Sequence, residues 1–205
     1  MRVLIVCHGD FPPENLLRQC HADSDMTLCT DGVAKHLEDM GIIPDAVIGD
    51  MDSLAGAVLT APVIDAGPHE IQENSDSEKV VLYALDAGAQ EIIILGATGG
   101  RLDHTLGNIA LCARYHKQAR IRIMDANCVV EVLQGWNEIQ TTPGAIVSLF
   151  ALTDDCVVTT YGLQWELDEP LAVGTRGISN RAADDRIVID VTTGLVTLVI
   201  LKEMD

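Results

Sequence analysis

Residues 44–53 read Pro-Asp-Ala-Val-Ile-Gly-Asp-Met-Asp-Ser, a short apolar run that ends in two aspartates one residue apart. The run is typical of a buried strand, and open α/β sheets bind their ligands where such strands end. We therefore expect Asp50 and Asp52 to lie at a ligand-binding edge, where both carboxylates can contact one Mg²⁺ ion. The alternative is a turn in which the two side chains only accept hydrogen bonds from nearby amides.

Around this run, short apolar segments alternate with helical patterns over residues 1–125. This alternation predicts βα units that build an α/β domain with a mainly parallel, Rossmann-like sheet. The expected strands cover residues 2–7, 26–29, 45–48, 62–65, 91–95 and 120–124. The expected helices cover residues 32–40, a segment that starts at the capping pair Ser75 and Glu78, and residues 102–115. Gly41 is expected to end the first of these helices.

The pattern changes after residue 125, where helical spacing disappears and β-branched runs alternate with turn residues. This predicts a second, all-β domain over residues 126–205, built as a sandwich. The expected strands cover residues 129–133, 145–152, 157–161, 186–191 and 195–201.

Composition narrows the class of protein. The chain has 205 residues and a net charge of −18, so nucleic acid and anionic membranes are disfavoured as partners. No apolar run is long enough to cross a bilayer, and the opening residues resemble a buried strand more than a signal peptide, so we expect a cytoplasmic protein. The six cysteines include no Cys-x-x-Cys pair and are interpreted as small buried hydrophobic residues.

A second acidic segment, Ser75-Asp76-Ser77-Glu78-Lys79, opens the predicted helix at residue 75. An acid in a first helical turn is ordinarily explained by capping and by the helix dipole. Here the helix start also offers free amides, the Asp76 carboxylate and the Lys79 ammonium one turn later. Together these groups resemble a site for polyphosphate and its metal.

The third segment, residues 96–104, reads Gly-Ala-Thr-Gly-Gly-Arg-Leu-Asp-His and joins a predicted strand to a helix. Its glycines allow close approach of a ligand to the backbone, although neither common nucleotide fingerprint is present. Arg101 is a candidate for a phosphate contact, and Asp103 is a candidate for contact with a cationic or amino-bearing ring. A lone histidine beside an acid is more often structural than catalytic, so His104 is not expected to be the base.

In this order and spacing, these segments resemble the motifs of the thiamine pyrophosphokinase family. The matching segments are residues 30–34, 44–53, 75–79, 96–104 with Asn108, 162–167 and 177–180. The resemblance covers nearly the whole chain. Each motif alone is a weak signal, but the joint occurrence of all of them is specific to the family. One departure is Val33, where the family more often has a second glycine; this bears on the shape of the loop at Asp31.

The resemblance implies an enzyme that transfers diphosphate from Mg·ATP to the hydroxyl of thiamine. It implies that Asp50, Asp52 and Asp76 hold Mg²⁺ and the ATP phosphates, with Gln72 close by. It also implies a homodimer whose active sites each combine the α/β domain of one subunit with the β domain of the other. The implied nucleotide contacts are Asp31, Lys79 and Arg101, and the implied thiamine contacts are Asp103, Ser179 and Asn180.

Three other functions are considered. The acceptor could be another hydroxymethyl heterocycle, such as a pterin, because the acidic residues do not distinguish acceptors. A nucleotide-sugar transferase also uses an Asp-x-Asp pair to hold a metal. A sensor that binds thiamine or nucleotide without turnover belongs to a different class, and the retained acidic residues argue against it.

Overall fold

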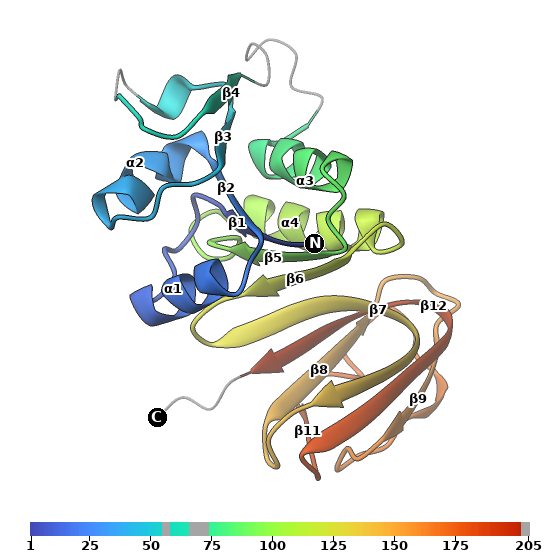
Figure 1. The fold of residues 1–205 in the computed structure, drawn as a ribbon. Helices are drawn as coiled ribbons and strands as arrows, with labels where there is room; N and C mark the ends of the chain where they lie inside the picture. The colour runs from blue at the N-terminus through green and yellow to red at the C-terminus, as the bar shows by residue number, and fades with distance from the viewer. Residues whose placement is uncertain (55–57, 66–73, 202–205) are drawn as a thin grey trace. The chain divides into compact units, whose positions relative to one another are not determined.

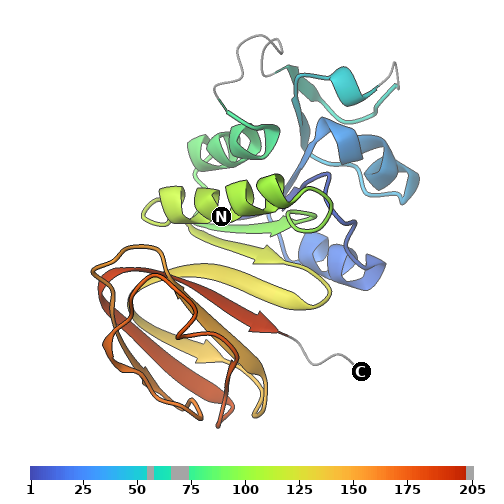
Figure 2. The same cartoon turned by 180° about the vertical axis from the view of Figure 1, so that it is seen from behind.

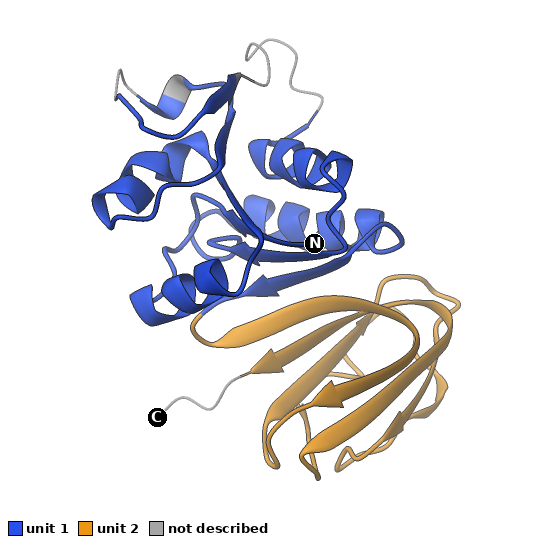
Figure 3. Cartoon of the chain, in the orientation of Figure 1, with its two compact units in different colours: residues 1–125 blue, residues 126–205 orange. Residues whose placement is uncertain are grey.

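The computed structural model describes residues 1–54, 58–65 and 74–201 (Figures 1 and 2). The chain divides into two compact units, residues 1–125 and residues 126–205, which we call unit 1 and unit 2 (Figure 3). Unit 1 alternates strands with helices, whereas the elements of unit 2 are strands.

The elements of unit 1 follow one another as β1 (Arg2–Val6), α1 (Glu14–Ala22), β2 (Met26–Thr30), α2 (Asp31–Asp39), β3 (Ala46–Gly49), the 3₁₀ turn η1 (Asp52–Leu54), β4 (Val63–Asp65), α3 (Asp76–Asp86), β5 (Glu91–Leu95), α4 (Leu102–Tyr115) and β6 (Arg120–Met124). The expected strands and helices of this part all occur, most of them within a residue or two of the expected bounds. Helix α1 was not predicted. It has only nine residues and buries little apolar surface, chiefly Leu17 and Cys20, so its pattern is weak.

The strands of unit 1 pair in parallel in the order β6-β5-β1-β2-β3-β4. Strand β1 is central, because its residue Val6 pairs with Cys29 of β2 on one side and with Leu95 of β5 on the other. Residues 3–6 of this strand are fully buried. Burial on both faces explains why the strands read as continuous apolar runs, since helices cover both sides of a parallel sheet.

The helices of unit 1 lie on the two faces of this sheet (Figure 1). Helices α1 and α2 share one hydrophobic core with the strands, to which α2 contributes Val33, Ala34 and Leu37. Helices α3 and α4 lie on the other face and contact each other. As predicted, α2 ends just before Gly41, which has a φ of 77°. That left-handed conformation suits glycine because it has no Cβ to clash.

The elements of unit 2 are β7 (Cys128–Gln140), β8 (Ile146–Ala151), β9 (Val157–Tyr161), β10 (Asp168–Pro170), β11 (Asn180–Arg181) and β12 (Arg186–Leu201). Strand β12 pairs antiparallel with β7, β8 and β9, and so organises the unit. Its alternating buried residues include Ile187, Ile189 and Val191, which form one core with residues of the neighbouring strands.

Two expectations for unit 2 need correction. The segments 186–191 and 195–201 were predicted as separate strands, but they form the single strand β12, whose register shifts between Val191 and Val196. Gly194, with a φ of 80°, accommodates this irregularity without ending the strand. The strand predicted at 129–133 likewise continues to Gln140 through Gly135, at a φ of 70°. The short strands β10 and β11 were not predicted.

All six cysteines lie in the described part of the chain, and no two of them form a disulfide. Burial raises the pKa of Cys7 to about 11 and that of Cys29 to about 12, so both stay neutral at pH 7. Five of the six are buried, in agreement with their interpretation as small buried hydrophobic residues, whereas Cys128 is only partly buried. Among the described residues, no helix is both long and apolar enough to span a membrane.

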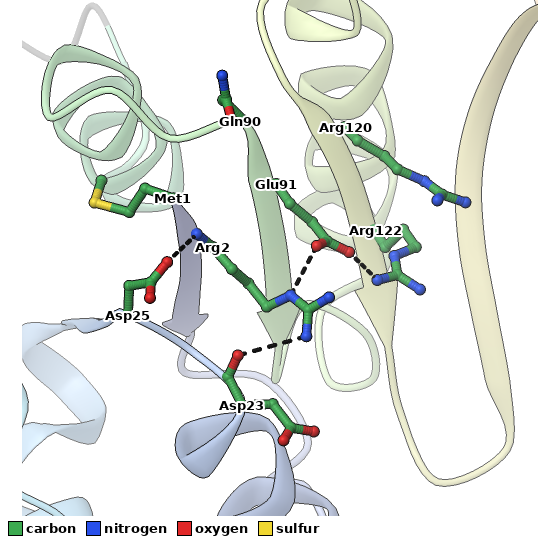
Figure 4. Close-up of a pocket in the computed structure, with 8 residues that line it drawn as sticks. All are labelled: Met1, Arg2, Asp23, Asp25, Gln90, Glu91, Arg120 and Arg122. Atoms are coloured by element: carbon green, nitrogen blue, oxygen red, sulfur yellow. Dashed lines mark hydrogen bonds and ion pairs between the residues drawn. The ribbon is translucent and has the colours of Figure 1, made fainter.

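An ion-pair cluster joins three strands at the amino-terminal edge of the sheet (Figure 4). Glu91 of β5 accepts a hydrogen bond from Nε of Arg2 at 2.7 Å and a second from Arg122 of β6. These residues line a hollow of about 640 Å³ together with Met1, Asp23, Asp25, Gln90 and Arg120. Burial raises the pKa of Glu91, but the hydrogen bond from Arg2 and the charges of both arginines outweigh it, and the net pKa is lowered.

Replacing Glu91 by Gln should destabilise the protein by about 1–2 kcal/mol at pH 7, because two arginines lose a shared carboxylate that is partly shielded from water. Since the pKa of Glu91 is lowered from 4.5, this contribution is complete above about pH 5 and is lost as the pH falls through the folded-state pKa. Urea unfolding at pH 7 and pH 3 measures both effects.

The matched control is Glu14→Gln. Glu14 pairs with Arg18 one turn away on α1, where both side chains are exposed, and its loss should cost less than about 0.5 kcal/mol. An equal loss of unfolding free energy in the two variants at pH 7 would contradict a larger stabilising contribution from Glu91 than from Glu14.

Candidate active site

The predicted site residues of unit 1 follow strands that end at the same edge of the parallel sheet. Asp31 comes directly after β2, Asp50 after β3, and the glycine-rich segment after β5. The strand order reverses at β1: the chain builds β2, β3 and β4 on one side and then returns to place β5 on the other. Ligands of open α/β sheets bind at such a reversal.

The loops that follow β1 and β5 are held together by backbone hydrogen bonds. Gly9 donates to the carbonyl oxygen of Gly96 at 2.8 Å, and Asp10 donates to that of Thr98 at 2.9 Å. A Cβ at Gly9 would overlap the Gly96 oxygen, and a Cβ at Gly96 would overlap the carbonyl oxygen of Cys7. Both positions therefore require glycine for close packing of the two loops.

Asp31 is the most enclosed carboxylate at this edge. The residue is 4% exposed, its Oδ1 accepts a 2.7 Å hydrogen bond from the backbone of Gly32, and its Oδ2 is buried without a hydrogen-bond partner among the described residues. Burial raises its pKa, and the charges of Asp76 and Asp50 raise it further, against hydrogen bonds from backbone amides that lower it. The three carboxylates are thus close enough to repel one another.

The Asp50 segment leaves β3 through an unusual backbone conformation. Met51 has a φ of 64°, a left-handed value that is uncommon for a residue with a side chain. Such strain concentrates at functional sites. The turn η1 begins directly afterwards at Asp52. The side chain of Asp52, and Gln72 as a whole, lie outside the described residues.

Helix α3 begins as the capping pattern predicts. Ser75 is the N-cap residue and accepts a hydrogen bond from the backbone of Glu78 at 3.3 Å. Lys79 extends over the first turn, and its Nζ lies 2.9 Å from Oδ1 of Asp76. The Glu78 side chain is buried and accepts a 2.6 Å hydrogen bond from Tyr115 of α4, which fixes the start of α3 against that helix.

Arg101 and Asp103 flank the first residue of α4 and pair with each other. Nε and Nη2 of Arg101 donate to the two carboxylate oxygens of Asp103 at 3.1 and 2.5 Å. The hydrogen bond from Arg101 lowers the pKa of Asp103 to about 2, so this exposed carboxylate is ionised at neutral pH. Behind them, the buried Asn108 donates to the carbonyl oxygen of Ala97 at 2.8 Å and holds the glycine-rich segment in place.

Two residues of this edge, His8 and Asp10, were not predicted. The His8 ring lies against Gly32 at the start of α2, and the Asp10 side chain lies against Gly99, so that a Cβ at either glycine would overlap it. Their position directly after β1 could have identified them, because the carboxyl end of every parallel strand reaches this edge of the sheet.

In unit 2, Ser179 and Asn180 have different environments. Ser179 is exposed at a φ of 60°, and its backbone donates to Oγ of Ser148 at 3.0 Å. The side chain of Asn180 is buried and bonded to the backbone of Trp165 in both directions, at 3.1 and 2.5 Å. It holds in place a loop whose Trp165 side chain is 56% exposed.

Comparison with known proteins agrees with this arrangement. The family model described as "Thiamin pyrophosphokinase, catalytic domain" matches residues 17–124, more than half of the chain, and "Thiamin pyrophosphokinase, vitamin B1 binding domain" matches residues 137–196. The chain belongs to the thiamine pyrophosphokinase family. Members of this family transfer diphosphate from ATP to thiamine, so the chain is identified as a diphosphotransferase.

Relatives of this family match the chain along most of its length. Thiamine pyrophosphokinase 1 of Arabidopsis thaliana is 28% identical over 98% of this chain and 86% of its own length. The thiamine pyrophosphokinase of Bacillus subtilis is 34% identical over 55% of this chain and 56% of its own. The crystal structure of the Bacillus subtilis enzyme has the same fold, with a TM-score of 0.85 at 23% identity and full coverage of both chains.

The family motifs of unit 1 lie at the edge built above, and those at residues 162–167 and 177–180 lie in unit 2. The hollow among Arg2, Glu91 and Arg122 lies at the opposite edge of the unit 1 sheet and is lined by no predicted site residue. After the larger effect of burial, the charges of Asp76 and Asp50 also raise the pKa of Asp31. Among the described side chains, no three carboxylate, imidazole or thiol groups are arranged as a ready metal site. The predicted metal ligands therefore stay a prediction.

Gly99 and Gly100 provide a matched test of the glycine-rich segment. Both have left-handed φ values, 77° and 58°, so alanine brings similar backbone strain, roughly 1 kcal/mol, at each. Only at Gly99 would the added Cβ overlap Asp10, whereas no atom of the described residues lies within 4 Å of a Cβ at Gly100. Gly99→Ala should therefore lower kcat/KM for ATP at least about tenfold more than Gly100→Ala, since displacement of the loop misplaces phosphate contacts.

Steady-state kinetics of both variants measures this difference. Replacing Asp10 by Ala in the Gly99→Ala protein should relieve the overlap and recover part of the loss. Similar kinetics for the two glycine variants would contradict a requirement for close contact between the loops.

Proposed function

We propose that the chain performs its family's reaction at the carboxyl-terminal edge of the unit 1 sheet, transferring diphosphate from Mg·ATP to the thiamine hydroxyl and releasing AMP. The observation that carries the proposal is Asp31, whose buried Oδ2 has no hydrogen-bond partner among the described residues and whose pKa is raised by burial and by Asp76 and Asp50. Carboxylates that raise one another's pKa favour a bound cation.

The donor chemistry fits Mg²⁺, which prefers carboxylate oxygens and usually takes one or two of them beside substrate phosphates. We assign the metal to Asp50, Asp52 and Asp76, with Asp31 behind them on the nucleotide side. When bound, Mg²⁺ neutralises charge on the phosphate oxygens. This assignment explains how several acidic side chains can lie at the binding site of a polyanion.

Lys79 and Arg101 supply the positive charge of the site, and Gln72 is proposed to lie near the phosphates. Lys79 already faces Asp76 at 2.9 Å, so it can contact a phosphate oxygen next to the metal. The Arg101–Asp103 pair is held weakly, because both side chains are exposed and water screens the attraction between their charges. Arg101 can therefore leave Asp103 for the transferred group, which frees the Asp103 carboxylate for the cationic acceptor.

The chemistry is proposed as an in-line attack of the thiamine hydroxyl on the β-phosphorus. The chain's residues hold the two substrates in line and stabilise charge on the transferred group, which accounts for most of the acceleration of phosphoryl transfer. A dedicated base is not required. If one acts, we assign it to Asp103, which lies beside the proposed acceptor, or to a carboxylate at the metal, rather than to His104.

The acceptor site is proposed to include unit 2 of a second subunit. Leu102 and Leu106, one turn apart on α4 and next to Asp103, are 71% and 59% exposed, which is unusual for leucines beside a polar site. In unit 2, Trp165 and Ile178 are exposed beside Ser179. A homodimer would cover both surfaces and place Ser179 at thiamine. Asn180 then acts indirectly, by holding the Trp165 loop.

The domain roles follow from the same proposal: residues 1–125 bind ATP and Mg²⁺, and residues 126–205 bind thiamine. The description of the first part as Rossmann-like and of the second as a sandwich stays an interpretation, as does the cytoplasmic location.

The double replacement Asp50→Asn, Asp52→Asn should abolish formation of AMP and thiamine diphosphate, because it removes two of the proposed metal ligands. Both products are measured with Mg·ATP and thiamine, and Mn²⁺ binding is measured separately by electron paramagnetic resonance. The control His104→Asn should keep activity within about a hundredfold of the native protein, the lower range for loss of a general base. Retained Mn²⁺ affinity in the double variant would contradict the metal assignment.

Mixing two inactive proteins tests the shared site. The Asp50→Asn, Asp52→Asn protein should be inactive because unit 1 loses proposed metal ligands. The Ser179→Arg protein should be inactive because the arginine blocks the proposed thiamine site of unit 2. Random exchange of subunits makes half of the dimers mixed, each with one intact site of two, so activity should return to about a quarter of the native value. Activity of Ser179→Arg alone, or no return in co-expressed mixed dimers, would contradict the shared site.

A further inference from the structure

The hollow at the amino-terminal edge of the unit 1 sheet gathers charged side chains that the proposed reaction does not use (Figure 4). Its volume of about 640 Å³ lies within the range of small-molecule sites. Three of the chain's 13 lysine and arginine residues line it, namely Arg2, Arg120 and Arg122, although the chain carries a net charge of −18. Basic side chains are thus concentrated here in an otherwise acidic protein.

Strand register places these side chains on one face of the sheet. Arg2 of β1 pairs with Glu91 of β5, and Glu91 pairs with Arg120 of β6. Arg122 lies two residues after Arg120, so it points to the same side of its strand. The four side chains therefore lie together on three neighbouring strands, at the edge where these strands begin.

Glu91 holds two guanidinium groups beside each other (Figure 4). One of its carboxylate oxygens accepts a hydrogen bond from Nε of Arg2 at 2.7 Å, and the other accepts from Nη2 of Arg122. One carboxylate neutralises only one of two positive charges, so the three groups together keep a single positive charge. Both arginine side chains stay partly exposed, at 39% and 24%, and both line the hollow.

These guanidinium groups have donors left for a ligand. Arg2 donates to Glu91 and, at 3.4 Å, to the carbonyl oxygen of Asp23. Arg122 donates to Glu91 through Nη2, while its buried Nε has no hydrogen-bond partner among the described residues. A guanidinium offers several N–H donors in a planar fork that matches the oxygens of a carboxylate or phosphate. An unpaired buried donor is unfavourable, so an oxyanion at this guanidinium offsets a cost that the unliganded protein bears.

Acidic groups bound the hollow on its other side. Asp23 ends helix α1, and Asp25 precedes β2 and accepts a 2.8 Å hydrogen bond from the backbone of Arg2. A long polyanion such as a nucleotide would meet these carboxylates, whereas an anion of few atoms can stay beside the arginines. The arrangement therefore selects for small size as well as for negative charge.

We propose that the hollow binds a small organic oxyanion, a carboxylate or a phosphate monoester, between the guanidinium groups of Arg2 and Arg122. Both groups can donate charge-assisted hydrogen bonds to its oxygens. Such a ligand stabilises the folded protein, because the two arginines come from β1 and β6 and meet only in the folded sheet. The site lies at the opposite edge of the sheet from Asp31 and Asp50, so it adds a binding activity that does not depend on the proposed reaction.

Malonate and methyl phosphate are the two probes, with malonamide as the neutral counterpart of malonate and NaCl to hold ionic strength constant. The full-length protein is labelled with ¹⁵N-arginine, and Arg2→Lys and Arg122→Lys assign the two Nε–H resonances. At least one probe should shift both resonances saturably, with half-saturation on the order of 1 mM. The probe that binds more tightly identifies the ligand as a carboxylate or a phosphate. The Arg101 resonance, at the catalytic edge, should not follow the same curve.

Matched variants test the contribution of each charge. Arg122→Gln should weaken binding at least about tenfold, because it removes one of the two guanidinium groups. The control Arg186→Gln removes the same charge from an exposed ion pair of unit 2 and should change binding less than about twofold. Glu91→Gln should act in the opposite direction and tighten binding at least about threefold, because neither arginine is then neutralised. Malonate should also raise the urea midpoint of Glu91→Gln more than that of the native protein.

The absence of a saturable shift with either probe, or an equal response to malonamide, would overturn the proposal. Equal weakening by Arg122→Gln and Arg186→Gln would also overturn it, because only the overall charge would then matter. A shift of the Arg101 resonance along the same curve would place the anion at the catalytic edge instead. If Arg122→Gln does not fold, Arg122→Lys replaces it in the comparison: it keeps the charge, loses the planar fork and should bind at least about threefold more weakly.

Discussion

The central strand β1 and its hydrogen bonds to both neighbours are the constraint on which unit 1 depends. Its residues 3–6 are fully buried, and it pairs with β2 on one side and with β5 on the other. The pairing with β5 continues beyond the strands, where Gly9 and Gly96 allow the two following loops to touch. Because the strands are parallel, this single arrangement brings the loops after β1, β2, β3 and β5 to one edge, where the family motifs at residues 30–34, 44–53 and 96–104 lie.

Electrostatics gives that edge its chemical character. Burial raises the pKa of Asp31, and the charges of Asp76 and Asp50 raise it further. The positive groups nearby, Lys79 and Arg101, form ion pairs with Asp76 and Asp103. The edge therefore carries both acidic and basic side chains.

Unit 2 shows how one strand can support separate surfaces. Strand β12 buries Ile187, Ile189 and Val191 on its core side and carries Val188 and Asp190 on its other side. The core side stabilises the unit, and the other side brings the rings of Trp136 and Tyr161 together. The buried Asn180 illustrates a different principle, since this polar side chain from a family motif holds the Trp165 loop through hydrogen bonds to its backbone.

The sequence by itself determined the family and most helices and strands of unit 1, because apolar runs, capping residues and motif spacing are local signals, and it predicted Asp50 and Asp76 as site residues. It did not reveal α1, whose nine residues bury little, or the continuity of β12 through Gly194, because glycine reads as a turn until its strand partners are known. Only the tertiary structure decided that His8 and Asp10 reach the site, that Asn180 is buried, and that Trp136 meets Tyr161. These contacts join residues that are distant in the sequence, and the burial of Asn180 depends on the segments that pack around it. No local pattern records which strands become neighbours.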